Sequence, residues 1–125
     1  MAVAQVHQRE IVEVPFTLPD GQILPHPALV LSCDDLQNVE PGMFYAVLIS
    51  SKNHYPGLTI PIQSEWLSTP LTKASYFVTH IVSMFNVEDV IAHHNCVLRH
   101  PFFDNVVDRI IANIVDGDWE ELKYQ

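Results

Sequence analysis

Hydrophobic and polar positions alternate in two stretches of the chain, residues 12–16 and 58–63. Alternation with a period of two predicts half-buried strands, because successive side chains of a strand point to opposite faces of the sheet. Pro61 places the second strand at a sheet edge or a bulge, since proline cannot donate to a central ladder. Continuous apolar runs predict three further strands, at residues 28–33, 43–51 and 75–85. The last run is long enough to bend midway.

The segments between these strands are polar or rich in proline. Residues 17–27 contain Asp-Gly and three prolines, which favours an excursion from the sheet with a turn at its tip. Residues 34–42, 52–57 and 64–74 are predicted to be loops. Residues 88–98 have an ambiguous pattern, which favours short extended pieces.

The hydrophobic period changes to that of a helix near the end of the chain. Apolar residues form two rows spaced by four and give a stripe about 100° wide. They are Val106, Val107, Ile110, Ile111, Ile114 and Val115. Pro101 and Gly117 lie where a helix start and a helix end favour them, so we predict a helix at about residues 102–115. Short strands followed by one helix predict a mainly β fold, a small barrel of about five to seven strands with a C-terminal α-helix.

The composition supports one domain. Of 125 residues, 48 % are hydrophobic, which is enough for one core but not for two. Charged residues make up 17 %, which excludes a disordered acidic protein. We expect a flexible N-terminus at residues 1–8, a single barrel domain at residues 9–115 and an acidic tail at residues 116–125.

The charge balance restricts the partners. Six Lys and Arg oppose 15 Asp and Glu, and the formal net charge is −9. This excludes a protein that binds DNA through a broad basic face, so any contact with nucleic acid must come from a local site. The chain shows no signal-peptide pattern and no apolar run that could cross a membrane, so we expect a cytoplasmic protein without membrane contact. Cys33 and Cys96 are too few for a disulfide framework and favour free thiols.

Four segments of the chain follow one another in the order of a known family. They are Glu10–Phe16 (EIVEVPF), Pro25–Ser32 (PHPALVLS), Val47–Ser51 (VLISS) and Leu71–Ile81 (LTKASYFVTHI). Together they resemble the MazF/PemK-like toxins of bacterial toxin–antitoxin modules, over about residues 10–115. The resemblance implies an SH3-like barrel with a terminal helix, a homodimer and a cognate antitoxin as partner. It also implies a sequence-specific endoribonuclease that cuts single-stranded RNA without a metal ion or another cofactor.

The chain departs from the family pattern at two places. Arg9-Glu10 replaces the usual Gly-Asp before the first strand, and His26 stands where the family has an active-site Arg. The second change leaves two functions open. The protein is either an endoribonuclease with an altered site, or a catalytically degenerate barrel that binds a protein or a peptide.

The resemblance also implies the residues of the site. RNA cleavage by the neighbouring 2′-hydroxyl needs a base, an acid and positive charge for the phosphorane. We hypothesise that His26 and His80 transfer protons and that Ser51 is the third catalytic residue, which holds the phosphate together with Lys52. The residues expected to bind phosphate or RNA are Ser50, Lys52, His54, Tyr55 and Lys73.

Each of these residues also has a structural interpretation. His26 lies between two prolines and is then an exposed loop residue, while His80 is a hydrogen-bonded histidine on an apolar strand. Ser50 and Ser51 end a strand through bonds to the backbone, and Tyr55 packs at the barrel mouth.

Zinc ligands crowd into one stretch, where His93, His94, Cys96 and His100 fall within eight residues. The paired Cys-x-x-Cys spacing is missing, and neighbouring residues of a strand point to opposite faces. The sequence therefore predicts no metal site here.

Overall fold

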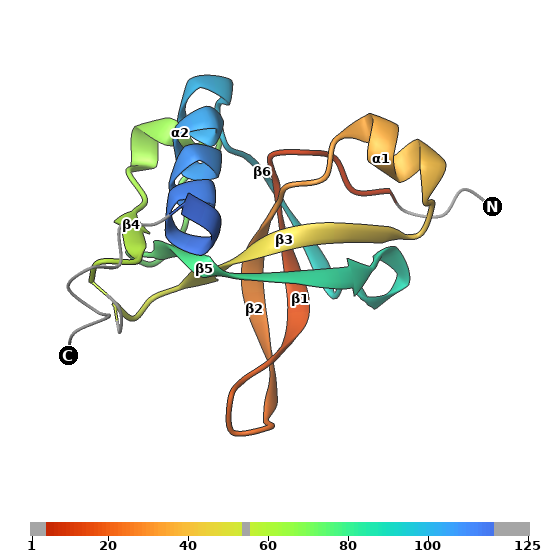
Figure 1. Ribbon diagram of the computed structural model, residues 1–125, viewed down its shortest axis with the longest axis horizontal. Helices are drawn as coiled ribbons and strands as arrows, with labels where there is room; N and C mark the ends of the chain where they lie inside the picture. The colour runs from red at the N-terminus through yellow and green to blue at the C-terminus, as the bar shows by residue number, and fades with distance from the viewer. Residues whose placement is uncertain (1–4, 54–55, 117–125) are drawn as a thin grey trace.

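The computed structural model describes residues 5–53 and 56–116. Six strands form one antiparallel sheet in the order β4-β5-β3-β2-β1-β6. The strands are β1 (Glu10–Thr17), β2 (Ile23–Val30), β3 (Met43–Ser50), β4 (Thr59–Pro61), β5 (Tyr76–Asn86) and β6 (Ala92–Val97). The helices are α1 (Asp34–Val39), α2 (His100–Ile111), the short η1 (Ser64–Trp66) and η2 (Val87–Asp89), and the π-helical turn η3 (Ala112–Asp116). Figure 1 shows α2 beside β4 and β5, whereas α1 lies at the opposite end of β3.

The predicted mainly β fold with a C-terminal helix is confirmed, but the sheet is open. Its edges are β4 and β6, and no ladder joins them within the described residues. The segment after η1 spans this gap, where Leu67 forms an isolated bridge with Leu98. The Ser68 N–H donates to the Val97 carbonyl at 2.9 Å. A connecting segment, rather than a strand, therefore covers this seam, and the sheet is not the closed barrel that the sequence predicted.

Residues 17–27 form a hairpin and not the predicted excursion. β1 and β2 pair along their full length, with Pro15 opposite Pro25. The Leu18 N–H donates to the Gln22 carbonyl at 2.8 Å, so the even-numbered pairs of this hairpin exchange hydrogen bonds. The prolines all occupy odd positions, whose nitrogens point away from the ladder. Proline therefore costs this hairpin no hydrogen bond. The turn predicted at the tip is confirmed, and the Gly21 N–H donates to the Leu18 carbonyl there at 2.9 Å.

Residues 34–42 were predicted to be a loop, but they contain α1. Asp34 and Asp35 lie in its first turn, where carboxylates interact favourably with the helix dipole. The helix is six residues long and buries none of its residues. Because it has no apolar face, the hydrophobic pattern carries no sign of it.

The terminal helix is confirmed, with different bounds. It starts at His100, two residues before the predicted start, with Pro101 in its first turn. Only part of the predicted stripe packs: Val106 is buried, whereas Ile114 and Val115 are exposed. Phe103, which lies outside the predicted stripe, is buried in the same cluster as Val106.

The two faces of the sheet carry separate apolar clusters. One contains Val12, Val14, Phe16, Ala28, Val30, Phe44, Ala46, Leu48, Val78, Phe85 and Val87. The other lies under α2 and contains Ile11, Leu29, Val47, Ile49, Leu67, Phe77, Cys96, Leu98, Phe103 and Val106. Val6 is 1 % exposed and belongs to the first cluster, so the packed domain includes part of the predicted flexible N-terminus. The predicted tail at residues 116–125 lies, apart from Asp116, outside the described residues. No helix of the described part is long and apolar enough to cross a membrane.

Neighbouring aromatic residues of β3 provide a test of this two-faced arrangement. Phe44 is fully buried, whereas Tyr45 is 42 % exposed on the opposite face. We expect Phe44→Ala to lower the free energy of unfolding by about 3–5 kcal/mol, because it leaves a cavity. Tyr45→Ala is the matched control and should cost about 1 kcal/mol or less. Urea unfolding measures both, and equal losses would contradict the assignment of faces.

Candidate functional site

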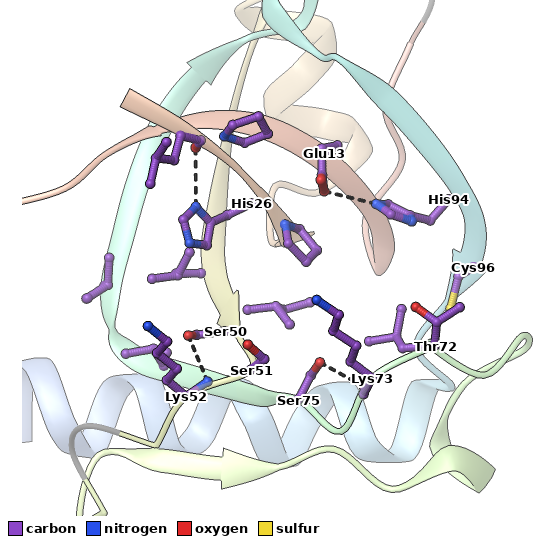
Figure 2. Close-up of a pocket in the computed structure, with 18 of the residues that line it drawn as sticks. Glu13, His26, Ser50, Ser51, Lys52, Thr72, Lys73, Ser75, His94 and Cys96 are labelled. Carbon is purple, nitrogen blue, oxygen red and sulfur yellow. Dashed lines mark hydrogen bonds and ion pairs between the residues drawn. The ribbon is translucent and has the colours of Figure 1, made fainter. Parts of the chain in front are cut away.

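A groove of about 740 Å³ lies between the β1–β2 hairpin, the end of β3, residues 69–75 and β6. Five of the predicted site residues line it: His26, Ser50, Ser51, Lys52 and Lys73. They come from three separate parts of the chain. Figure 2 shows His26 on one side of the cavity and the serines and lysines on the opposite side.

The hairpin register places His26 at the groove. His26 pairs with Val14 of β1, and its ring meets the edge of Phe16 at 6.3 Å between ring centroids. Its Nδ1 lies 3.2 Å from the Leu24 carbonyl oxygen. A carbonyl can only accept, so Nδ1–H donates and Nε2 remains for other partners. His26 is therefore a half-buried, oriented residue of a strand, and not a loop residue.

The end of β3 supplies the serines and a lysine. The Lys52 N–H donates to Ser50 Oγ at 3.1 Å, so Ser50 terminates the strand as the structural interpretation predicts. This bond uses Ser50 as an acceptor and leaves its hydroxyl proton available. On the opposite segment, Ser75 Oγ donates to the Lys73 carbonyl at 3.0 Å, and the Lys73 side chain points into the cavity (Figure 2).

The structure does not bring His80 to the groove. His80 lies on β5 and is absent from the groove lining, and burial lowers its pKa below the usual 6.5. The β3–β5 register jumps there, from Val47↔Val82 to Leu48↔Val78, so residues 79–81 form a bulge that confirms the predicted bend. The predicted site residues His54 and Tyr55 lie outside the described residues.

The groove also holds a carboxylate–histidine pair that the sequence did not indicate. His94 Nε2 lies 3.1 Å from Glu13 Oε2, and both residues line the groove. The His94 and Glu13 side chains are 33 % and 24 % exposed. Eighty-one positions separate them in the sequence, and only the pairing of β1 with β6 makes them neighbours. No local motif could have revealed this pair.

The four residues with zinc-ligand chemistry have separate partners. His93 pairs with Glu10 at 3.1 Å, and His100 lies 3.6 Å from Asp104. The buried Cys96 thiol donates to the Thr69 carbonyl at 3.0 Å. Within the described chain, no group of three or more potential metal ligands comes together. Cys33 and Cys96 are both free thiols, with Cys33 exposed.

The charge of the groove differs from that of the whole chain. Among the described residues, two of the six Lys and Arg of the sequence line the groove, Lys52 and Lys73. Of the 15 Asp and Glu, one described residue lines it, Glu13. The groove is thus a local concentration of positive charge on an acidic protein, and this favours an anionic ligand.

Comparison with known proteins gives a consistent result. A family model described as PemK-like, MazF-like toxin of type II toxin-antitoxin system matches residues 7–114. No curated protein sequence matches the chain significantly.

Solved structures of low sequence identity share the fold. An endoribonuclease in complex with its cognate antitoxin, from a mycobacterial species, is 12 % identical with a TM-score of 0.66, and the match covers 92 % of this chain and 99 % of that one. MazF from Deinococcus radiodurans is 14 % identical with a TM-score of 0.68, over 86 % of this chain and 94 % of that one. The toxin MazF-mt6 of Mycobacterium tuberculosis is 15 % identical with a TM-score of 0.62, over 89 % and 100 %.

The lowered pKa of His80 predicts a pH-dependent stability. Between the lowered pKa and 6.5, the unfolded chain binds the His80 proton and the folded chain does not, so the free energy of unfolding falls as the pH falls. We expect His80→Gln to reduce this fall between about pH 7.5 and pH 5.5. Urea unfolding of both proteins across this range measures the difference. Parallel pH profiles would contradict the assignment.

Proposed function

The chain belongs to the PemK-like, MazF-like toxins of type II toxin–antitoxin systems, and we propose that it is an endoribonuclease that cleaves single-stranded RNA in this groove. The observation that carries the proposal is the composition of the groove. Its lining combines two lysines, three serines, His26 and His94 on a chain of net charge −9. Together, these groups fit a phosphodiester as the ligand.

The proposed reaction needs no metal ion. The 2′-hydroxyl attacks the neighbouring phosphorus, and the 5′-oxygen of the next nucleotide leaves. A base accepts the 2′-proton, an acid protonates the leaving oxygen, and the products are a 2′,3′-cyclic phosphate and a 5′-hydroxyl. Lys52 and Lys73 stabilise the negative charge that develops on the phosphorane.

Each residue of the groove has a role in this proposal. Ser51, with Ser50, donates hydroxyl protons to a phosphate oxygen. His26 is a proton-transfer group, because its Nδ1 is engaged by the Leu24 carbonyl and its Nε2 is left to face a substrate. His80 was assigned the second proton transfer by resemblance alone, and its position away from the groove lining leaves this role to be assigned.

The partners follow from the family. Two of the similar structures are described as MazE-MazF of Deinococcus radiodurans, and a third as an endoribonuclease with its cognate antitoxin. We propose that this chain also has a cognate antitoxin, whose disordered segment folds into the groove and excludes RNA. We further propose that the protein acts as a homodimer in the cytoplasm.

One observation favours a second function, that of a binding module without catalysis. His26 stands in place of the family's Arg, and Glu13 adds a carboxylate that repels phosphate. A groove that carries charges of both signs also suits a peptide with both charges. The two functions differ in whether purified protein cuts RNA.

The first prediction of this proposal concerns cleavage. In chelator, the protein should cut a long single-stranded RNA at discrete positions and leave 2′,3′-cyclic phosphate and 5′-hydroxyl ends. His26→Ala should reduce the rate by at least about 10², the contribution of a general acid or base. His100→Ala is the control, because its 70 % exposed side chain lies on α2 and is not part of the groove lining. Intact RNA with folded, antitoxin-free protein would support the binding module instead.

The second prediction concerns the salt dependence of RNA binding. Each phosphate contact of a lysine releases counterions, so Lys52→Ala and Lys73→Ala should each reduce the slope of log K against log salt by about 0.7. Binding of a labelled oligonucleotide at several salt concentrations measures the slope. Arg109→Ala, on α2 and absent from the groove lining, should leave it unchanged. A slope that responds equally to all three changes would place the RNA elsewhere.

A further inference from the structure

The Glu13–His94 pair has the geometry of a carboxylate–histidine dyad at the wall of the groove. Nε2 of His94 contacts Glu13 Oε2 at 3.1 Å, and Figure 2 shows His94 on the right of the cavity, across from His26 on the left. An ionised Glu13 accepts a hydrogen bond from Nε2–H, which selects the tautomer of the neutral ring that has its lone pair on Nδ1. The ring is then prepared to accept a proton at Nδ1.

A bulge in β6 positions this ring. The β1–β6 register shifts between Val12↔His93 and Glu10↔Val97, so residues 94–96 of β6 stand opposite Ile11 alone. Asn95 within the bulge has φ of +52°, a left-handed conformation that asparagine tolerates better than most residues. Bulges redirect side chains next to sites, and here both His94 and Cys96 line the groove.

We propose that His94, oriented by Glu13, is the general base that accepts the 2′-hydroxyl proton, and that His26 is the acid. This assignment rests on the proposed endoribonuclease function. The base passes from neutral to cationic in the reaction, and the Glu13 carboxylate stabilises the imidazolium that forms. His26 acts in its cationic form, in which Nδ1–H donates to the Leu24 carbonyl and Nε2–H gives its proton to the leaving 5′-oxygen. Its contact is a neutral carbonyl and not a carboxylate, which makes the imidazolium the readier proton donor of the two.

The chain supplies a matched control for the dyad. His93 pairs with Glu10 across the same strands at the same 3.1 Å, and its side chain is 32 % exposed against 33 % for His94. Neither Glu10 nor His93 lines the groove. Loss of either pair therefore costs the β1–β6 ladder a similar contact, but only loss of the Glu13–His94 pair changes the groove.

The experiment measures single-turnover cleavage of an RNA oligonucleotide that contains one mapped site. His94→Ala should lower the rate by at least about 10², whereas His93→Ala should stay near the wild-type rate. Glu13→Gln should give a smaller loss than His94→Ala, and Glu10→Gln should give none. Added imidazole should partly restore His94→Ala, since free imidazole can replace a missing base but cannot repair a misfolded strand.

A modified substrate separates the base from the acid. A 5′-bridging sulfur at the cleavage site leaves without protonation, so His26→Ala should recover most of its activity on this substrate. His94→Ala should not recover, because the 2′-proton must still be removed. Recovery of His94→Ala instead would overturn its assignment as the base.

The outcomes distinguish this inference from the proposed function. If the wild type cleaves and His94→Ala behaves like His93→Ala, the endoribonuclease stands and the dyad assignment is wrong. Loss in His80→Gln with none in His94→Ala would also overturn it and return the role to His80. A folded wild type that leaves RNA intact refutes the proposed function, and the dyad assignment is refuted with it.

Discussion

The pairing of β1 with β2 on one edge and with β6 on the other is the interaction on which the rest of the structure depends. Ile11, Val12 and Val14 are fully buried, and they contribute to the apolar clusters on both faces of the sheet. Because both neighbours are antiparallel, β1 also fixes which residues of distant segments meet at the groove. A shift of the β1–β2 register by one residue would turn His26 to the other face of the sheet.

The sequence was informative wherever the burial pattern was local. The alternation at residues 12–16 and the position of Pro61 on an edge strand both follow from side-chain period and proline chemistry, and the structure agrees. The bend in the long strand at residues 75–85 was predicted as well. α1 was missed because it buries no residue. The prolines of β2 misled because the partner strand decides which backbone nitrogens of a strand form the hydrogen bonds of the ladder, and this is not visible in the sequence. Five of the candidate site residues share one groove, whereas Glu13 and His94 meet only through sheet register.

The opposition between an acidic chain and a groove with two lysines affects how an anion would approach. At physiological salt, charges more than about 8 Å from an anion contribute little to its electrostatic energy. For an anion inside the groove, the nearby lysines therefore contribute more than the distant acidic surface. The acidic surface disfavours contact elsewhere on the molecule. The charge pattern therefore favours selectivity for the groove over general affinity for nucleic acid.

The seam between β4 and β6 has a mechanical consequence for the groove. One groove wall belongs to a continuous ladder, whereas residues 69–75 of the opposite wall follow directly from the segment that crosses the seam. Hydrogen bonds between residues 65–69 and residues 95–99 hold this segment, among them Ser68 N–H to the Val97 carbonyl and Arg99 N–H to the Trp66 carbonyl. Local opening of these bonds would separate no pair of strands, so we expect this wall to open more readily than the ladder. The width of the groove can then adapt to a ligand while Glu13 and His94, on the paired strands β1 and β6, stay in place.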